Sequence, residues 1–265
     1  MKCFSIDLDG TLLDSKHMLS DENYQVLQDL KKQGHHVIIN TGRAVEDVLK
    51  IDAIQGLETP IISINGNIIY TEKRETLFEA ALPTATYKEL FPILQNLGLW
   101  IMVYTNQGGF PCRNPDIQDK RPEEIAPIFQ DYDYEKILEK QGLKIYKVMA
   151  VTRPEELEKI DQAKKAIEGN LEISYASSFP NNVEFTSVEA NKGSALLRYQ
   201  QLTKQSFSEI YAFGDGGNDV SQFKVATTSI AMGNAPAAVQ QEADIITKTN
   251  NENGFAYAVK QLIKL

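Results

Sequence analysis

The chain has 265 residues, of which 42% are hydrophobic and 24% are charged, a balance typical of a folded protein and not of a disordered one. Its 27 basic and 36 acidic residues give a formal net charge of −9, which argues against nucleic acid or an anionic membrane as the main partner because both would repel it. We find no leader segment and no apolar run of about 18 residues, and the two cysteines match no metal or redox spacing, so we expect a cytoplasmic protein.

The first third of the sequence alternates short apolar runs with helical patterns. Strands and helices are expected in turn, at residues 3–6, 20–34, 37–39, 44–54 and 61–64. Asn65-Gly66 then predicts a turn into a further strand at residues 68–70. Strands that are apolar throughout and are separated by helices are typical of a parallel sheet with helices on both faces.

The middle of the sequence, from about residue 82 to residue 185, has a different pattern. Helices are expected at residues 87–97 and 154–167, and strands of mixed polarity at residues 100–104, 145–151, 171–175 and 183–185. Such alternation predicts an antiparallel sheet with one covered face. Its aromatic residues are candidates for a substrate-facing surface, although most are expected in the core of this segment: Trp100, Tyr104, Phe110, Tyr175 and Phe179.

The last third returns to the first pattern. Elements are expected at residues 192–204, 210–213, 229–232, 235–242, 245–246 and from 254 onward. We therefore predict an α/β fold in which residues 1–81 and 186–265 form a doubly wound, mainly parallel, Rossmann-like core. Residues 82–185 form an inserted α+β cap domain.

Acidic residues follow two of the predicted core strands. Asp7 and Asp9 come directly after the first strand, and Asp215 and Asp219 come after the strand at residues 210–213. In an open parallel sheet the carboxyl ends of the strands carry the chemistry, and period two brings Asp9 to the same side as Asp7. Clustered carboxylates repel one another unless one gains a proton or a cation lies between them, and an oxygen-rich site completed by water suits Mg²⁺. An Asp-Gly turn with solvated acids is the alternative for either motif alone.

Two further motifs supply groups that bind anions. Thr41-Gly42-Arg43 follows a strand and precedes a helix, so its hydroxyl and backbone N–H groups could hold an anion. Lys192 begins another helix after the insert. Taken alone, Thr41 would be a helix cap and Lys192 a solvated surface lysine. The three histidines match no metal or triad spacing, and we interpret them as structural or exposed: His17, His35 and His36.

The four motifs in this order resemble those of the haloacid dehalogenase-like hydrolases, and the large insert resembles the cap of the Cof-type sugar-phosphate phosphatases. The resemblance covers essentially the whole chain. One departure is Gln222, which stands where the family often has methionine. We interpret it as a matter of local packing.

The resemblance implies that Asp7 is the nucleophile and forms an aspartyl-phosphate, while Asp9 acts as general acid and base with a raised pKa. It implies Mg²⁺ as the cofactor, held by Asp7, the backbone carbonyl of Asp9 and Asp215, with support from Asp219. The groups that would bind the substrate phosphate are Thr41, the amides of Gly42 and Leu8, Asn218 and Lys192. Arg43 and Asn65 are candidates for contact with the leaving group or cap, or else for an ion pair and a turn.

The function that follows is Mg²⁺-dependent hydrolysis of small phosphorylated metabolites, such as sugar phosphates, with the insert as a lid. One alternative is a phosphomutase or phosphotransferase of the same superfamily. The other is a non-catalytic phospho-acceptor switch module, which needs about half this length and leaves the insert without a role. The sequence does not indicate the oligomeric state.

Overall fold

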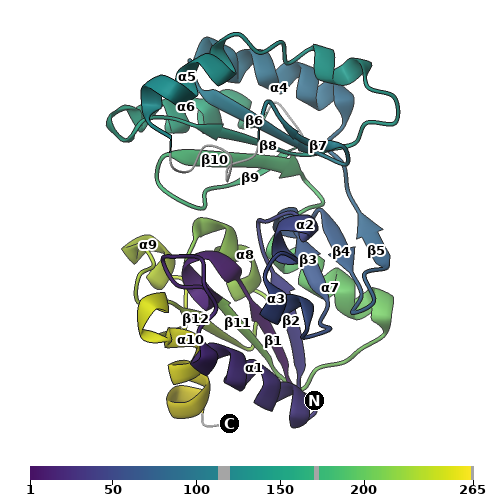
Figure 1. Cartoon of the computed structure of the whole chain (residues 1–265), viewed down its shortest axis with the longest axis vertical. Coiled ribbons are helices and arrows are strands. Elements are labelled where there is room, and N and C mark those ends of the chain that lie inside the picture. Colours follow the sequence, from purple (N-terminus) through teal and green to yellow (C-terminus); the bar gives the residue numbers. More distant parts are fainter. Residues whose placement is uncertain (113–119, 170–172, 264–265) are drawn as a thin grey trace. The chain divides into compact units, whose positions relative to one another are not determined.

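The computed structural model describes residues 1–112, 120–169 and 173–263. The chain folds into two compact units, one formed by residues 1–79 and 190–265 and the other by residues 80–189 (Figure 1). The second unit is an insertion into the first, and each unit has its own sheet and its own core.

The first unit is built on a mainly parallel sheet with the strand order β13-β12-β11-β1-β2-β3-β4-β5. β1 lies inside this sheet and pairs in parallel with both β2 and β11, which places Ile6 beside Ile39 and Phe213. The pairs β3–β4 and β4–β5 are antiparallel. The strands are β1 (Cys3–Ile6), β2 (His36–Asn40), β3 (Ile61–Ser63), β4 (Ile68–Tyr70), β5 (Thr76–Glu79), β11 (Ile210–Gly214), β12 (Thr228–Ala231) and β13 (Ile245–Ile246).

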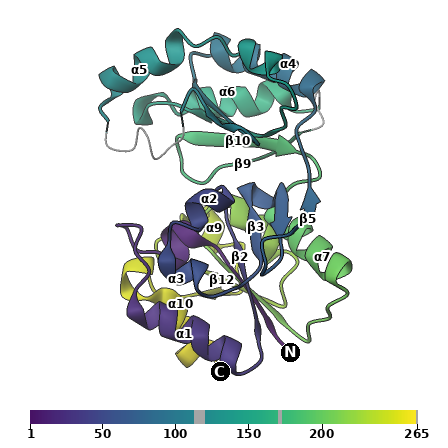
Figure 2. The same cartoon turned by 45° about the vertical axis from the view of Figure 1, so that its right-hand side comes forward.

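Helices cover both faces of this sheet (Figure 2). On one face α1 and α10 pack against Phe4 and Ile6, and on the other face α7 packs against Cys3 and Ile38. The helices of this unit are α1 (Asp21–Lys32), α2 (Val45–Val48), α3 (Asp52–Gln55), α7 (Lys192–Thr203), α8 (Val220–Phe223), α9 (Ala237–Gln240) and α10 (Gly254–Tyr257). The predicted doubly wound α/β fold is confirmed.

Two helix predictions in this unit have different outcomes. The first helix is confirmed, because the Ser20 hydroxyl accepts a hydrogen bond from the Asn23 N–H at 3.2 Å and so caps α1. The single helix expected at residues 44–54 is wrong. The backbone is extended at Ile51, which separates α2 from α3, and Val48 and Ile54 both still reach the core.

The second unit has an antiparallel sheet with the strand order β7-β6-β8-β10-β9, as the mixed polarity of its segments predicts. α4 and α6 cover one face, and α5 packs on the other beside Trp100 and Met102. The elements are α4 (Thr84–Asn96), β6 (Trp100–Thr105), β7 (Gly108–Phe110), α5 (Pro122–Gln130), β8 (Ile145–Val151), α6 (Glu158–Ile167), β9 (Ile173–Ala176) and β10 (Asn182–Ser187). Residues 171 and 172 of the expected third strand lie outside the described residues.

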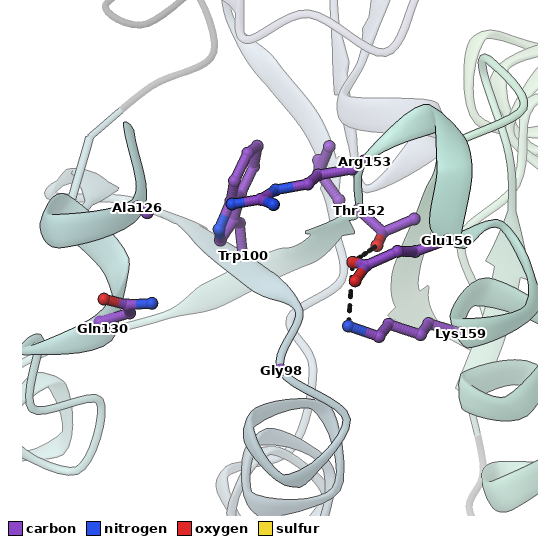
Figure 3. A pocket seen from close by; sticks show the side chains of 9 residues that line it. Gly98, Trp100, Ala126, Gln130, Thr152, Arg153, Glu156 and Lys159 are labelled. Carbon is purple, nitrogen blue, oxygen red and sulfur yellow. Dashed lines mark hydrogen bonds and ion pairs between the residues drawn. The ribbon is translucent and has the colours of Figure 1, made fainter. Parts of the chain in front are cut away.

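The second unit also contains a cavity of about 200 Å³. Its lining includes Trp100, Arg153 and an ion pair of Glu156 with Lys159, whose N–O distance is 2.9 Å (Figure 3). None of the residues that the four motifs single out lines this cavity. Among the described residues, no helix is both long and apolar enough to cross a membrane.

Candidate active site

Asp7 lies at the carboxyl end of β1, next to the end of β11. Its backbone N–H donates to the Phe213 carbonyl at 3.1 Å, which continues the β1–β11 pairing by one residue and fixes where the side chain begins. The side chain is buried, with a relative exposure of 6% for the residue. A carboxylate in such a place needs a charged or hydrogen-bonding partner, because burial penalises the ionised form.

Lys192 supplies that partner. It is the first residue of α7 and is fully buried, so the alternative that it is a solvated surface lysine is excluded. Its Nζ donates to Asp7 Oδ1 and to Asp219 Oδ1, each at 2.7 Å. Burial alone would lower the pKa of Lys192, but the two carboxylates outweigh it and raise that pKa. Lys192 is therefore a permanently charged bridge between the two acids.

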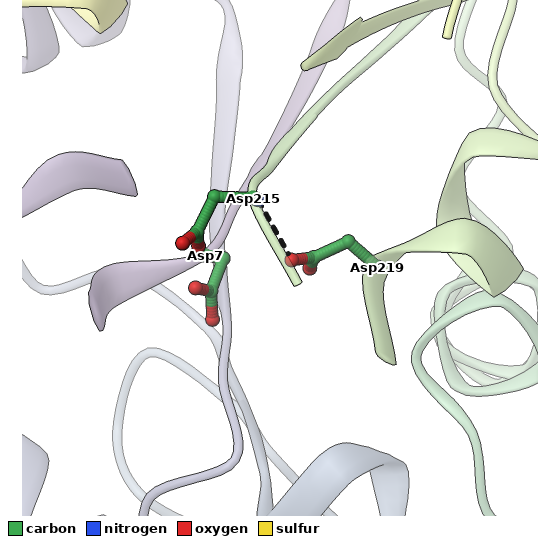
Figure 4. A group of neighbouring side chains, drawn as sticks. All are labelled: Asp7, Asp215 and Asp219. Carbon is green, nitrogen blue, oxygen red and sulfur yellow. Dashed lines mark hydrogen bonds between the residues drawn. The ribbon is translucent and has the colours of Figure 1, made fainter. Parts of the chain in front are cut away.

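Three carboxylates meet at this point. Asp7, Asp215 and Asp219 each offer an oxygen, and these oxygens lie within 4.8 Å of one another (Figure 4). The carboxylate of Asp219 turns back toward the main chain, where its Oδ2 accepts hydrogen bonds from the N–H groups of Asp215 at 3.0 Å and Gly216 at 2.9 Å. Asp219 is thus held on both oxygens, by Lys192 on one and by two backbone N–H groups on the other.

The pKa values of the other two acids, Asp7 and Asp215, reflect that arrangement. Burial, together with the negative charges of Asp219 and Asp215, raises the pKa of Asp7 despite the opposing effect of Lys192. Burial and the charge of Asp219 raise the pKa of Asp215 to about 7. Both shifts have the same physical cause, which is that negative charge is crowded and poorly solvated here, and a bound cation would relieve it.

Gly10 and two polar side chains fix Asp215. The Thr11 hydroxyl donates to Asp215 Oδ1 at 3.1 Å, and the amide of Asn234 reaches Asp215 Oδ2 at 3.3 Å and the Gly10 carbonyl at 2.8 Å. Gly10 has a φ of +73°, and a Cβ atom there would lie 2.2 Å from Asp215 Oδ2. Only glycine fits at this turn, because any side chain would displace the carboxylate.

Asp9 has a different environment from the one that the sequence predicts. Its carboxylate accepts two hydrogen bonds from Arg43, from Nε at 2.7 Å and from Nη2 at 2.5 Å, and its Oδ1 lies 3.0 Å from His17 Nδ1. Burial would raise the pKa of Asp9, but Arg43 and His17 outweigh it and lower that pKa. The expected raised pKa is therefore wrong, and the Asp9 carboxylate is not one of the three clustered oxygens, because the chain turns over residues 8–12 where an extended strand was assumed.

The Thr41 motif lies at the carboxyl end of β2. The Thr41 hydroxyl is buried and accepts a hydrogen bond from the Arg43 N–H at 3.2 Å. The Asn65 backbone N–H donates to the Thr41 carbonyl at 3.0 Å, and its Oδ1 accepts from the Asn218 amide at 3.1 Å. A Cβ atom on Gly42 would lie 3.0 Å from Asn65 Oδ1, so Gly42 permits a close approach. Asn65 thus links the Thr41-Gly42-Arg43 motif to the motif that contains Asn218. The side chain of Leu8 is buried in the core.

Sequence reasoning missed Asn234 and the contact of His17 with Asp9. Asn234 had a usable signal, because it follows β12 and therefore lies at the carboxyl edge of the same sheet. His17 had none, because its position depends on the course of the loop after Asp14.

Comparisons with known proteins identify the family to which the chain belongs. The model of the haloacid dehalogenase-like hydrolase family matches residues 4–259. The phosphatase YwpJ of Bacillus subtilis is 29% identical over 99% of this chain and 100% of its own. The 5-amino-6-(5-phospho-D-ribitylamino)uracil phosphatase YwtE of the same organism is 29% identical over 99% and 98%. A solved haloacid dehalogenase-like hydrolase from B. subtilis superimposes with a TM-score of 0.86 at 28% identity, covering 99% of this chain and 100% of that one.

The chain belongs to the haloacid dehalogenase-like hydrolases. Within that family it is similar over its full length to proteins named as phosphatases, and it is a phosphoric monoester hydrolase.

Proposed function

We propose that this phosphatase hydrolyses phosphomonoesters of small metabolites, sugar phosphates or related compounds, in the cytoplasm and in a Mg²⁺-dependent reaction through an aspartyl-phosphate on Asp7. The observation that carries the proposal is the buried contact of Lys192 with both Asp7 and Asp219, beside Asp215. This contact supports the proposal because it brings together the carboxylate that we propose as nucleophile, a buried ammonium group and a cluster of acidic oxygens. An anionic phosphate needs all three in order to approach a carboxylate.

The residues at the site fit Mg²⁺. Carboxylate oxygens are ligands that this hard cation prefers, and the oxygens of Asp7, Asp215 and Asp219 lie close together. Asp7 and Asp215 would hold the ion with the backbone carbonyl of Asp9, and Asp219 would support the site from behind. A bound Mg²⁺ would neutralise charge between the acids and the phosphate.

The side chains of the chain itself carry the proposed steps. An oxygen of Asp7 attacks phosphorus, the bond from phosphorus to the ester oxygen breaks, and the carboxyl of Asp9 gives its proton to the departing alcohol. Asp9 then takes a proton from a water molecule, which attacks the aspartyl-phosphate, releases phosphate and restores Asp7. Because Arg43 holds Asp9 as an ion pair with a lowered pKa, this pair must first separate and Asp9 must take up a proton from solvent before it can protonate the departing alcohol.

The remaining predicted residues would bind the phosphate. Lys192 would offset the charge on the phosphate oxygens, and losing such a group typically costs about a hundredfold or more in rate. The Thr41 hydroxyl, the amides of Leu8 and Gly42, and the Asn218 side chain would complete the cradle. Residues 82–185 would act as a lid that excludes water and contacts the rest of the substrate.

The relatives support a small phosphorylated substrate. YwtE is named for a phosphorylated ribityl compound, which has the size and charge that we propose for this substrate. The net charge of −9 also disfavours a nucleic acid.

The experiment is a screen of phosphate release from a panel of phosphorylated metabolites, with and without Mg²⁺. We expect Mg²⁺-dependent release by the wild type, none by Asp7→Asn, and full activity in Asp52→Asn, a matched control on the exposed first turn of α3. Isomerised phosphoester without free phosphate would instead identify a mutase. Normal turnover by Asp7→Asn would overturn the assignment of the nucleophile, and a stable phosphoprotein without turnover would indicate the switch module.

A further inference from the structure

A cluster of three polar side chains lies beneath the acidic site, inside the first unit. Ser5 is on β1, Asn40 ends β2 and Gln222 is on α8, and all three are fully buried. The neighbouring side chains on this face of the sheet are apolar, among them Ile38 and Ala212. Polar groups buried this deeply need hydrogen-bond partners, and these three form them with one another.

The hydrogen bonds form a continuous network. Ser5 Oγ donates to Gln222 Oε1 at 2.7 Å, and the Asn40 amide donates to Ser5 Oγ and to Gln222 Oε1, each at 3.1 Å. Gln222 Nε2 donates to the Phe213 carbonyl at 3.1 Å and to Asp219 Oδ1 at 2.8 Å. Asp219 Oδ1 is the atom that also accepts from Lys192. The network therefore ends on the central ion pair of the site.

The direction of the network follows from its partners. The Phe213 carbonyl and the Asp219 carboxylate are both acceptors, so the NH₂ group of Gln222 must face them and its oxygen must face the other side. Ser5 and Asn40 therefore donate to that oxygen. The Asn40 amide also donates to the main-chain carbonyl of Lys192 at 3.1 Å. One set of donors thus holds both Asp219 and the start of the helix that carries Lys192.

Stability alone does not explain this cluster. Asn40 Oδ1 is buried, and within the described part of the chain no donor reaches it, an arrangement that costs about 1–3 kcal/mol. Methionine has nearly the volume of glutamine and would fill the Gln222 site, but it would remove the acceptor that Ser5 and Asn40 share and the donor that reaches Asp219. A glutamine at position 222 is informative because the two N–H groups of its amide point at the Phe213 carbonyl and at the Asp219 carboxylate.

We propose that Gln222 is a positioning residue of the phosphoryl-transfer site. Its Nε2 fixes Asp219 Oδ1 and shares that oxygen with Lys192, so that Lys192 stays balanced between Asp219 and Asp7 instead of being drawn toward Asp219. The interpretation of Gln222 as a matter of packing is thereby replaced. This inference rests on the proposed function, in which Lys192 must face the phosphate.

The first test is Gln222→Met, which keeps the volume and removes both donors. We expect kcat to fall about tenfold, or about 1.4 kcal/mol of transition-state stabilisation, with KM changing less than about twofold. Gln222→Glu keeps the acceptor but places a carboxylate against Asp219, and it should lose at least as much. The control is Val26→Ala on α1, which removes buried methyl groups from the core and should lower Tm without changing kcat.

A double-mutant cycle separates positioning from general damage. If Gln222 acts through Asp219, adding Gln222→Met to Asp219→Asn should cost less than about twofold further, because the shared partner is already altered. An additive loss, or a folded Gln222→Met enzyme with wild-type kcat, would overturn the proposal.

A crystal structure of metal-free Gln222→Met provides a readout that needs no catalysis, so it also stands if the proposed function fails. We expect the Asp219 carboxylate or the Lys192 ammonium to have moved, with a longer contact between Lys192 Nζ and Asp7 Oδ1. Unchanged contacts at both partners of Lys192 would contradict the proposal.

Discussion

Two acid–base pairs that begin only two residues apart differ sharply in this site. Asp7 pairs with Lys192 in full burial, whereas Asp9 pairs with Arg43 where the two side chains are 43% and 23% exposed. Burial and neighbouring acids raise the pKa of Asp7, while Arg43 and His17 outweigh burial and lower that of Asp9. An opposite charge at hydrogen-bond distance therefore does not by itself set a pKa. The surrounding acids and the depth of burial decide whether the pKa of the paired carboxyl is raised or lowered.

The difference separates two roles. In the buried pair Lys192 is held between two carboxylates, so this pair suits a group that must stay in place while a phosphate arrives. The Arg43 pair is only half-buried, so water can reach it and the pair can open more easily than the buried one. We therefore expect changes to the buried pair to have much larger effects than changes to the half-buried one.

The largest effect is expected from Lys192→Met. Removing the ammonium leaves Asp7 and Asp219 buried without their shared partner, and it removes the charge that faces the phosphate, so kcat should fall about a thousandfold. Steady-state phosphate release with the best substrate measures this. Lys224→Met, at an exposed position just after α8, is the matched control and should keep full activity. A loss below about tenfold for Lys192→Met would contradict the central role of this lysine.

The next effect is expected from Gly10→Ala. Its Cβ would lie 2.2 Å from Asp215 Oδ2, so the carboxylate must move, and kcat/KM should fall about a hundredfold. Gly34→Ala is a close control because Gly34 has a similar φ of +78° with no atom within 4 Å of the added Cβ. It should cost about 1 kcal/mol of stability and leave kcat unchanged. Equal losses of activity in both variants would show that backbone strain, and not the position of Asp215, is responsible.

Mg²⁺ binding should depend on pH with a definite sign. Asp215, with a pKa of about 7, is mostly protonated at pH 6 and mostly ionised at pH 8, and the ion must displace its proton. The Kd for Mg²⁺ should therefore be about tenfold higher at pH 6 than at pH 8, because the proton on Asp215 competes with the ion. Calorimetry in buffers of different ionisation enthalpy should also show proton release on binding. A Kd that does not change over this range would mean that Asp215 is already ionised before the metal binds.

The smallest effect is expected from Arg43→Gln. Arg43 lowers the pKa of Asp9, so its removal should raise that pKa and keep Asp9 protonated to higher pH. The alkaline limb of the kcat/KM profile should move upward, while the value at the optimum changes less than about threefold. An unmoved limb would argue that Asp9 is not the proton donor.

The sequence predicted most of the core fold because local patterns there agree with the tertiary structure. Apolar strands, the Ser20 cap and the Asn65-Gly66 turn all carry their signal in a few neighbouring residues. The break at Ile51 and the strands β5 and β7 had no comparable signal, because these short elements depend on packing against the rest of their unit. The helix α5 was missed although Glu123 and Glu124 in its first turn are a helix-start signal.

The site shows the same limit. Strand ends indicated that Asp7 and Asp215 would converge, since residues at one edge of a parallel sheet must lie near one another. Lys192 begins a helix, and its place in the site was implied only by the resemblance to the family. The course of the loop after Asp9 decides which acid joins the cluster, and side-chain directions inside the core decide that Gln222 reaches Asp219. Neither is encoded in spacing.

The measurement that tests the central claim most directly is identification of the phosphorylated residue. The enzyme is quenched in acid during turnover with Mg²⁺, reduced with borohydride so that an aspartyl-phosphate becomes homoserine, and mapped by peptide mass spectrometry. We predict homoserine at position 7 in the wild type and none in Asp7→Asn. Modification at another residue, or none at position 7 while phosphate is being released, would contradict the account.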